Sequence, residues 1–399
     1  NFTLMPWKTR LFSPETTMRL CFTVVVSYAA FLAGMFVAHN WMVDAKGHPI
    51  DADFIDVWAA GQLVLSHTPQ AVYDWHIHRL AELRAIGHEF HGYYGWHYAP
   101  PFLFVAALLA CVSYVPAYLG FTIATLAAFA ATMARIVKRN EAALIACAFP
   151  AILLNASVGQ NGCLSAALMG ASLLLLEERP ILSGIFLGLL TYKPQLGILF
   201  PFVLALDGRW RAIASASVTA ALMMAASWFA FGAQTWRAFF HSIPHTTQAV
   251  LVQGQAGFNK LQSVFGLVRW LGGGVDAGWI GQFSVLAIAA IATLWLWRRD
   301  VPFALKAAAL ALSSLLATPY LYVYDFPVLV LTLGFLARQR AFDALEKLAI
   351  VAASLSIIIF LGLSVPIGLI AIGLMAWLIA RRVMGLADAP APHVAMQRA

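Results

Sequence analysis

Long apolar runs separated by short polar connectors dominate the hydropathy pattern of this chain. The runs lie near residues 19–38, 99–115, 117–136, 142–158, 162–176, 181–206, 212–231, 279–297, 302–318, 325–337, 344–363 and 366–380. About 20 apolar residues in a helix are enough to cross the hydrocarbon core of a bilayer. The pattern therefore predicts an all-α polytopic membrane protein, a bundle of roughly 10 to 13 transmembrane helices.

Basic residues in the short connectors predict which side each connector faces. Such clusters occur at 8–19, 138–139, 209–211, 298–299, 338–340 and 381–382. Because cytoplasmic loops are enriched in Lys and Arg, residues 39–98, 232–278 and 318–325 are expected on the opposite side. Two full crossings between Tyr98 and Arg135 would put Lys138 and Arg139 outside as well. Either residues 99–115 enter the membrane without crossing it, or that basic pair is an exception.

The first long connector, residues 39–98, contains seven of the 18 carboxylates and eight of the 11 histidines of the chain. Within it, Phe54, Trp58, Gly61 and Leu65 recur at helical spacing, which predicts an amphipathic helix lying in the membrane interface. Asp51 is the expected N-cap of this helix. A second juxtamembrane helix is predicted over residues 75–86.

The overall composition supports a single membrane domain. Hydrophobic residues make up 61% of the 399 residues and charged residues 11%, and the net charge of +7 comes from connector residues. That charge fits anionic lipid rather than nucleic acid. The four cysteines lie in apolar runs, so no disulfide is expected. We expect one integral-membrane domain over residues 1–385, its first run retained rather than cleaved as a signal peptide, and a disordered cytoplasmic tail at 386–399.

Asp53 and Asp56 are the first candidates for catalysis. Three residues apart on a helix, their carboxylates can face the same way, towards a cleft between connector and membrane. A carboxylate at that low-dielectric boundary can have a raised pKa and act as a general base towards a hydroxyl. The alternative is a solvated helix face, favoured only by the helix dipole.

Polar residues also interrupt apolar runs on the same predicted side. Gln160 and Asn161 lie between two glycines, and the run 181–206 is broken by Tyr192-Lys193-Pro194-Gln195, which predicts two short helices. A lysine in an apolar stretch snorkels, pairs or binds an anion, and the helix that starts after Pro194 also favours negative charge at its N-terminus. Lys193 is thus a candidate phosphate ligand, with plain snorkelling as the alternative.

A third set of candidates comes from the later connectors. Tyr322 and Tyr324 could form an aromatic belt, whereas Asp325 could pair with Lys193 or reach the cleft. Lys260 belongs to a polar stretch that could line a substrate entrance. His97 enters the membrane beside the proposed cleft. The other histidines, such as His76 and His78, do not share one helix face and lack an evident third ligand, so no metal site is expected.

The ordered set of motifs resembles the bacterial glycosyltransferase family 87, which has the GT-C fold and includes polyprenyl-phosphate-mannose-dependent α-mannosyltransferases. The motifs are Asp53-Phe-x-x-x-Trp58-x-Ala-Gly61, Tyr73-Asp74, Tyr98-x-Pro-Pro101-Phe, Gly159-Gln-Asn-Gly162, Tyr192-Lys-Pro-Gln195 and Thr318-Pro-Tyr-x-Tyr. The resemblance implies a polyprenyl-phosphate-linked sugar donor, with mannose as the expected sugar, and a catalytic aspartate at Asp53, with Asp56 as second choice. The resemblance also implies that Lys193, which matches the Tyr-Lys-Pro motif of the family, belongs to the site. Some relatives have histidine where this chain has Tyr322, Tyr324 and Asp325.

This resemblance and the residues together predict an inverting transferase of the bacterial cytoplasmic (inner) membrane that acts in cell-envelope biosynthesis. Its site would face the periplasm or the outside, and its acceptor would be a lipid, glycan or protein. No cofactor is required, although a divalent cation shared by Asp53, Asp56 and phosphate is left open. The alternatives are a transporter or flippase of lipid-linked sugars and a lipid-binding scaffold. A transporter would place its charges along a midplane path.

Overall fold

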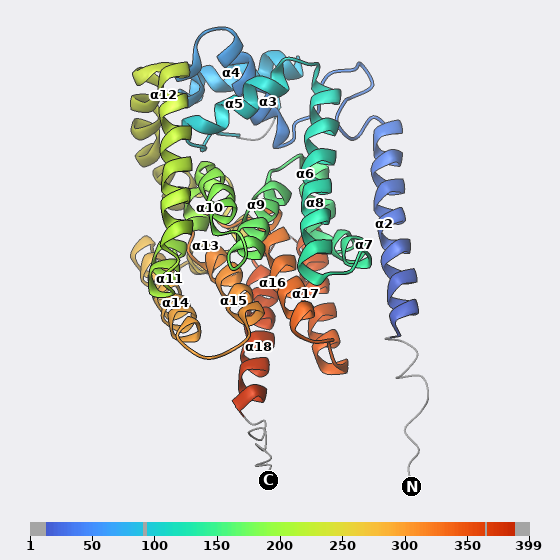
Figure 1. Ribbon diagram of the computed structural model, residues 1–399. Coiled ribbons are helices and arrows are strands. Elements are labelled where there is room, and N and C mark those ends of the chain that lie inside the picture. Colours follow the sequence, from blue (N-terminus) through green and yellow to red (C-terminus); the bar gives the residue numbers. More distant parts are fainter. Residues whose placement is uncertain (1–12, 91–93, 364, 388–399) are drawn as a thin grey trace, which may run out of the picture.

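The structure is all-helical, with α2, α6 and α12 running roughly parallel in Figure 1. The computed structural model describes residues 13–90, 94–363 and 365–387. Five helices in those ranges are long and apolar enough to span a membrane: α2 (Pro14–Val37), α6 (Tyr114–Val137), α12 (Trp210–Thr246), α14 (Val275–Trp297) and α18 (Gly368–Ala387). The predicted class, an all-α polytopic membrane protein, is confirmed.

Membrane-length helices are fewer in the described ranges than the apolar runs predict. Several runs are divided into shorter helices, which rise 1.5 Å per residue and do not reach across a core of about 30 Å. These are α7 (Glu141–Cys147), α8 (Pro150–Val158), α9 (Gly162–Leu175), α10 (Pro180–Leu189), α11 (Phe200–Leu206), α15 (Phe303–Leu316) and α16 (Pro327–Gln339). Prolines begin α8, α10 and α16, and α7 and α8 are bent by 68° at their break. Average hydropathy does not register such breaks.

Short helices of the first connector and of the apolar run that follows it form a layer across one end of the bundle, which we call the cap (Figure 1). It consists of α3 (Phe54–Leu65), η1 (Pro69–Tyr73), α4 (Trp75–Ile86), η2 (Pro100–Phe102) and α5 (Leu103–Ala110). Gly61 lets α3 approach α5 closely, because a Cβ there would lie 2.1 Å from the carbonyl oxygen of Ala106. Gln62 also donates a hydrogen bond of 3.1 Å to the carbonyl of Ala110.

Helix α3 occupies the predicted range but not the predicted environment. It is buried on two faces: Phe54 and Ala60 are inaccessible, and Asp56, expected on a polar face, is only 5% exposed. The reason is that α4 packs on the side of α3 that would otherwise be exposed to solvent. The expected cap is wrong as well, since Asp53 rather than Asp51 occupies the N-cap position, and its side chain makes no capping hydrogen bond. Helix α4 matches its predicted range, and Asp74 caps it.

The position of α5 resolves the topology around residues 99–115. The eight residues of α5 span about 12 Å, far less than a bilayer core. It lies in the cap, so the chain stays at the cap end from the end of α2 to the start of α6 (Figure 1). Helix α6 then returns Lys138 and Arg139 to the end of the bundle where α2 begins. The basic pair is therefore no exception to the predicted sidedness.

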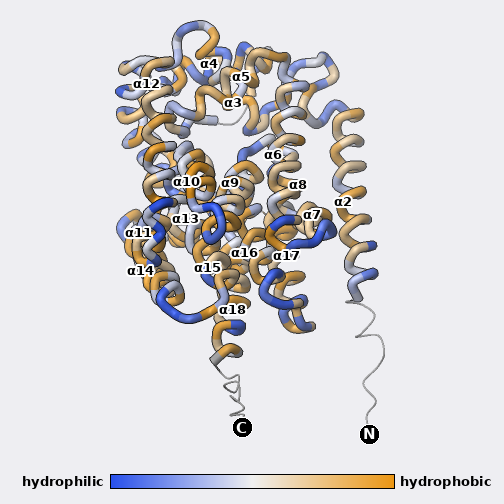
Figure 2. Tube along the Cα trace, viewed as in Figure 1, coloured by the Kyte–Doolittle hydropathy of each residue, from blue (hydrophilic) through white to orange (hydrophobic). Residues whose placement is uncertain are grey.

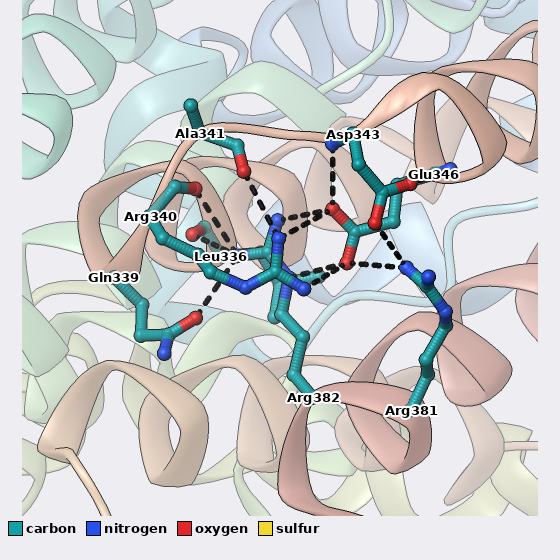
Figure 3. A network of polar contacts seen from close by, with 8 residues as sticks. All are labelled: Leu336, Gln339, Arg340, Ala341, Asp343, Glu346, Arg381 and Arg382. Carbon is teal, nitrogen blue, oxygen red and sulfur yellow. Dashed lines mark hydrogen bonds and ion pairs between the residues drawn. The ribbon is translucent and has the colours of Figure 1, made fainter. Parts of the chain in front are cut away.

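A buried ion-pair network holds the helices together at the end opposite the cap, where hydrophilic connectors gather near α7, α11 and α17 in Figure 2. Glu346, near the start of α17 (Ala344–Leu363), is inaccessible to solvent. Its two oxygens accept hydrogen bonds of 2.8 and 3.1 Å from Arg340 and of 2.9 and 3.0 Å from Arg382 (Figure 3). Arg381 lies 3.4 Å from Glu346 and also pairs with Asp343. The basic clusters 338–340 and 381–382 thus meet at one end, as expected.

The segment 232–278 is largely helical rather than an irregular loop. Helix α12 continues through a kink at Gly232, where φ is 80°, to Thr246, followed by η5 (Thr247–Val252), η6 (Phe258–Lys260) and α13 (Val264–Trp270). A further short turn, η7 (Val323–Asp325), precedes α16. These elements wall the space beneath the cap. Of the predicted tail, residues 388–399 lie outside the described residues.

Candidate active site

A cavity of about 690 Å³ lies between the cap and the bundle. Its lining comes from α3, the segment before α5, the turn before α9, the break between α10 and α11, the outer end of α12, and η7. All the candidate residues singled out in the sequence line it except Asn161: Asp53, Asp56, His97, Gln160, Lys193, Gln195, Lys260, Tyr322, Tyr324 and Asp325. The structure therefore brings together residues that are as far apart as 53 and 325 in the chain.

Asp53 faces the cavity from the first turn of α3 and is held by Gln160. The Nε2 atom of Gln160 donates a hydrogen bond of 3.0 Å to Oδ2 of Asp53, and the hydroxyl of Tyr98 donates one of 3.2 Å to Oε1 of Gln160. Desolvation raises the pKa of Asp53 to about 6, an effect that the Gln160 hydrogen bond opposes and the nearby Asp56 reinforces. A carboxyl with that pKa is suited to accept a proton near neutral pH.

Two glycines allow the turn that carries Gln160 to touch its neighbours. Gly159 has a φ of 68°, and a Cβ there would lie 2.6 Å from the Cβ of Phe54. At Gly162 a Cβ would lie 1.7 Å from the carbonyl oxygen of Tyr324. Asn161 is 1% exposed and lies behind the cavity wall, and among the described residues its side-chain amide has no hydrogen-bond partner. The turn thus connects the start of α3 to η7.

Asp56 does not share the environment of Asp53. The sequence predicted that both carboxylates face the cleft, and both do line it. Asp56, however, is tied to α4, since its Oδ1 lies 2.8 Å from Nε2 of His78. Glu82, one turn further along α4, has its Oε1 3.5 Å from the same nitrogen. Asp53 is therefore the less constrained of the two carboxylates.

Lys193 and Asp325 form an ion pair on another wall of the cavity. Nζ of Lys193 lies 2.7 Å from Oδ1 of Asp325, and the two residues are 6% and 4% exposed. The backbone N–H of Tyr322 donates to the second oxygen, Oδ2, at 3.3 Å. The ring of Tyr324 lies 5.4 Å from Nζ of Lys193. Of the two arrangements left open for Asp325, the structure has the pair with Lys193, and both residues also line the cavity.

His97 and Lys260 contribute different electrostatics to the cavity. Nδ1 of His97 lies 3.1 Å from the hydroxyl of Thr246, and its ring lies 5.9 Å from that of Trp75. Desolvation in the cavity wall lowers the pKa of His97. Lys260 is exposed in η6, and no ion pair to it occurs within the described ranges. It is the less constrained of the two cavity lysines.

Several cavity residues were not named as candidate site residues. Tyr98, Tyr192 and Tyr320 belong to the motifs that carry the resemblance, and they line the cavity beside the candidates. Tyr320 also donates a hydrogen bond of 3.0 Å to Thr247. Ser242 and Thr246 come from the cap end of α12, and Thr247 begins η5. The sequence feature that could have identified Ser242, Thr246 and Thr247 is the polar stretch from His241 to Gln248, which interrupts an otherwise apolar region.

The fold and the cavity define a polytopic membrane protein with three aspartates and two lysines around one site beneath a helical cap. A family model of glycosyltransferase family 87 matches residues 96–319, more than half of the chain. The chain therefore belongs to glycosyltransferase family 87, as the motifs predicted, and is a membrane glycosyltransferase. No curated protein and no solved structure matches it. The matched stretch includes Gln160 and Lys193 but begins after Asp53, whose role depends on its geometry.

Proposed function

We propose that this enzyme transfers a sugar, mannose by preference, from a polyprenyl phosphate to an acceptor hydroxyl on a lipid, glycan or protein. Asp53 is the general base, and the cap faces the periplasm or the outside of a bacterial inner membrane. The observation that carries the proposal is the position of Asp53. Its carboxyl, with a pKa raised to about 6, opens onto a cavity that also contains Lys193 and Lys260.

The reaction needs one proton transfer, which suits a single aspartate. The acceptor oxygen attacks the anomeric carbon while the bond from that carbon to the phosphate oxygen breaks, and Asp53 accepts the acceptor proton. The amide of Gln160 donates a hydrogen bond to Oδ2 of Asp53. In the described part of the chain no hydrogen bond reaches Oδ1 of Asp53, and this oxygen can accept the proton of the acceptor hydroxyl. One in-line displacement inverts the anomeric centre. A β-linked lipid donor would therefore give an α-linked product.

The departing phosphate needs positive charge, and the two cavity lysines can supply it. Lys260 is exposed and reaches the phosphate first. Lys193 is buried beside Asp325, which forms an ion pair with it in apolar surroundings. In a site from which water is excluded, such fixed charges stabilise the phosphate that forms in the transition state.

The polyprenyl chain needs an apolar route from the bilayer to the cavity. Phe239, Ile243 and Val250 contribute apolar side chains to the cavity wall from the outer part of α12 and from η5. On the same stretch, Phe240 is 60% exposed and Ile243 45% exposed, so this helix presents an apolar surface that suits lipid. A lipid tail along α12 would place its phosphate near Lys260 and Lys193.

A panel of polyprenyl-phosphate sugars tests the proposal directly. Purified enzyme, donor and a hydroxyl acceptor should release polyprenyl phosphate, and Asp53→Asn should abolish that release while donor binding is kept. Asp51→Asn, on the same segment but outside the cavity, is the matched control. A flippase would instead move the donor between leaflets of a vesicle without releasing phosphate, and that result would overturn the proposal.

A further inference from the structure

His78 lies between two carboxylates where α4 packs on α3. Its Nε2 is 2.8 Å from Oδ1 of Asp56 and 3.5 Å from Oε1 of Glu82. All three residues are buried, with exposed fractions of 1% for His78, 5% for Asp56 and 0% for Glu82. His78 and Glu82 are four residues apart, so they share one face of α4. The three ligand atoms lie within 4.8 Å of one another.

This cluster leaves buried polar atoms unsatisfied. Among the described residues, neither oxygen of Glu82 has a hydrogen-bond partner, and Nδ1 of His78 has none. Nη1 of Arg79 forms an ion pair with Oε2 of Glu82 at 3.7 Å, which compensates its charge only in part. Buried polar atoms are normally satisfied, and exceptions often indicate a water or an ion at the site. A buried carboxylate in particular requires a compensating charge.

The spacing of the three ligand atoms suits a metal ion. Bonds of about 2.0 to 2.2 Å from a divalent ion to nitrogen and oxygen, at angles between about 90° and 109°, put neighbouring ligands about 2.8 to 3.6 Å apart. The observed separations of 2.8 and 3.5 Å lie within that range. We propose that Asp56, His78 and Glu82 bind one divalent cation, of the Zn²⁺ or Mn²⁺ type. An imidazole with two carboxylates and no thiolate is a donor set for these ions.

The proposed ion differs from a catalytic metal shared by Asp53 and the donor phosphate. It is held on the α4 side of Asp56 and connects the two cap helices that frame the cavity. It would fix Asp56, three residues after Asp53, and would neutralise the buried charge of Glu82. Binding of the ion does not depend on the proposed transfer reaction.

Metal binding by the purified full-length chain in detergent tests this site. After treatment with EDTA and its removal, Mn²⁺ is titrated and the free ion is followed by electron paramagnetic resonance, with Zn²⁺ as competitor. The wild type should bind one Mn²⁺ per chain. Glu82→Gln and His78→Asn should each weaken binding by at least about tenfold, the lower end of the effect of losing even a supporting partner. His76→Asn, an exposed histidine on the same helix, is the matched control and should bind as the wild type does.

Two results would overturn the proposal. One is a wild-type chain that binds no more Mn²⁺ or Zn²⁺ than the Glu82→Gln chain does, which would mean that a shared proton holds the cluster. The other is an equal loss in His76→Asn. The wild-type titration remains decisive even if a variant fails to fold. Because the titration contains no donor lipid, a failed transfer reaction with intact ion binding would refute the proposed function alone.

Discussion

Gln160 donates a hydrogen bond of 3.0 Å to Asp53, and this contact joins two residues 107 positions apart in the chain. One residue belongs to the cap and the other to the turn that opens α9. Tyr98 fixes the orientation of the Gln160 amide from its other side. The reactive position is therefore defined by the docking of the cap on the bundle, and not by α3 alone.

Removing the base should nearly abolish sugar transfer. General-base catalysis contributes about 10²- to 10⁴-fold, so Asp53→Asn should lower kcat by that factor with little change in KM for the donor. Release of polyprenyl phosphate in single-turnover reactions measures the effect. Full activity in Asp53→Asn would exclude Asp53 as the base.

The pH profile should report the Asp53 carboxyl. Because only the ionised form accepts a proton and the pKa is about 6, activity should rise with pH through a midpoint near 6. Gln160→Leu removes a hydrogen bond that favours the ionised form, so its midpoint should move to higher pH. Rates from pH 4.5 to 8.5 check this. A midpoint that stays fixed in Gln160→Leu would assign the titration to another group.

The Lys193–Asp325 pair should matter to stability through its burial. Removing one partner leaves a buried charge uncompensated, which costs about 3 to 5 kcal/mol. Thermal unfolding in detergent should therefore show a large loss for Asp325→Asn and for Lys193→Met. The double variant Lys193→Met/Asp325→Asn should recover much of it while transfer remains impaired. Single losses that simply add in the double variant would mean that the pair is not coupled.

Lys260 should contribute to donor binding rather than to folding. A hydrogen bond to a charged group is worth about 1.5 to 3 kcal/mol, so Lys260→Met should raise KM for the donor by about tenfold or more at unchanged thermal stability. Lys46→Met, an exposed lysine outside the cavity, is the control. Equal effects of the two substitutions would indicate general attraction of anionic lipid and no specific phosphate contact.

The close approach at Gly162 should tolerate no side chain. Its Cβ would overlap the carbonyl oxygen of Tyr324, so Gly162→Ala should displace η7 and destabilise the enzyme by about 1 to 3 kcal/mol. Gly120→Ala, a glycine on α6 with open space around its Cβ position, should be neutral or slightly stabilising. Thermal unfolding of both variants separates the steric effect from that of an added methyl group.

The sequence predicted the membrane class, the ranges of α3 and α4, the break at Lys193 and ten of the residues that line the cavity. These features could be predicted because each depends on local chemistry, which composition, periodicity and the positions of prolines report. The burial of Asp56 was not predictable, because it depends on α4 packing against α3, a contact between distant side chains. For the same reason Glu82 passed unnoticed: its importance comes from the position of His78 and Asp56 around it.

Helix boundaries failed where tertiary contacts override hydropathy. For the apolar run 99–115 the sequence left open whether it crosses the membrane; α5 has eight residues and packs against α3 in the cap, where Gly61 permits a close approach. The run 212–231 ends in the sequence where polar residues begin, but α12 continues to Thr246 because its polar turns face the cavity. A one-dimensional pattern does not distinguish polar residues that face a cavity from those of a loop.

The arginines around Glu346 have a consequence for biogenesis. Arg340 precedes Glu346 in the chain, whereas Arg381 and Arg382 follow it and lie in α18. During synthesis the carboxylate of Glu346 therefore has Arg340 as its one cationic partner of this network until α18 has inserted. In a chain truncated before Arg381, the charge of Glu346 would be only partly compensated when α17 packs into the bundle. Insertion of α18 is thus the step that completes the charge compensation of Glu346 at the end opposite the cap, far from the proposed chemistry.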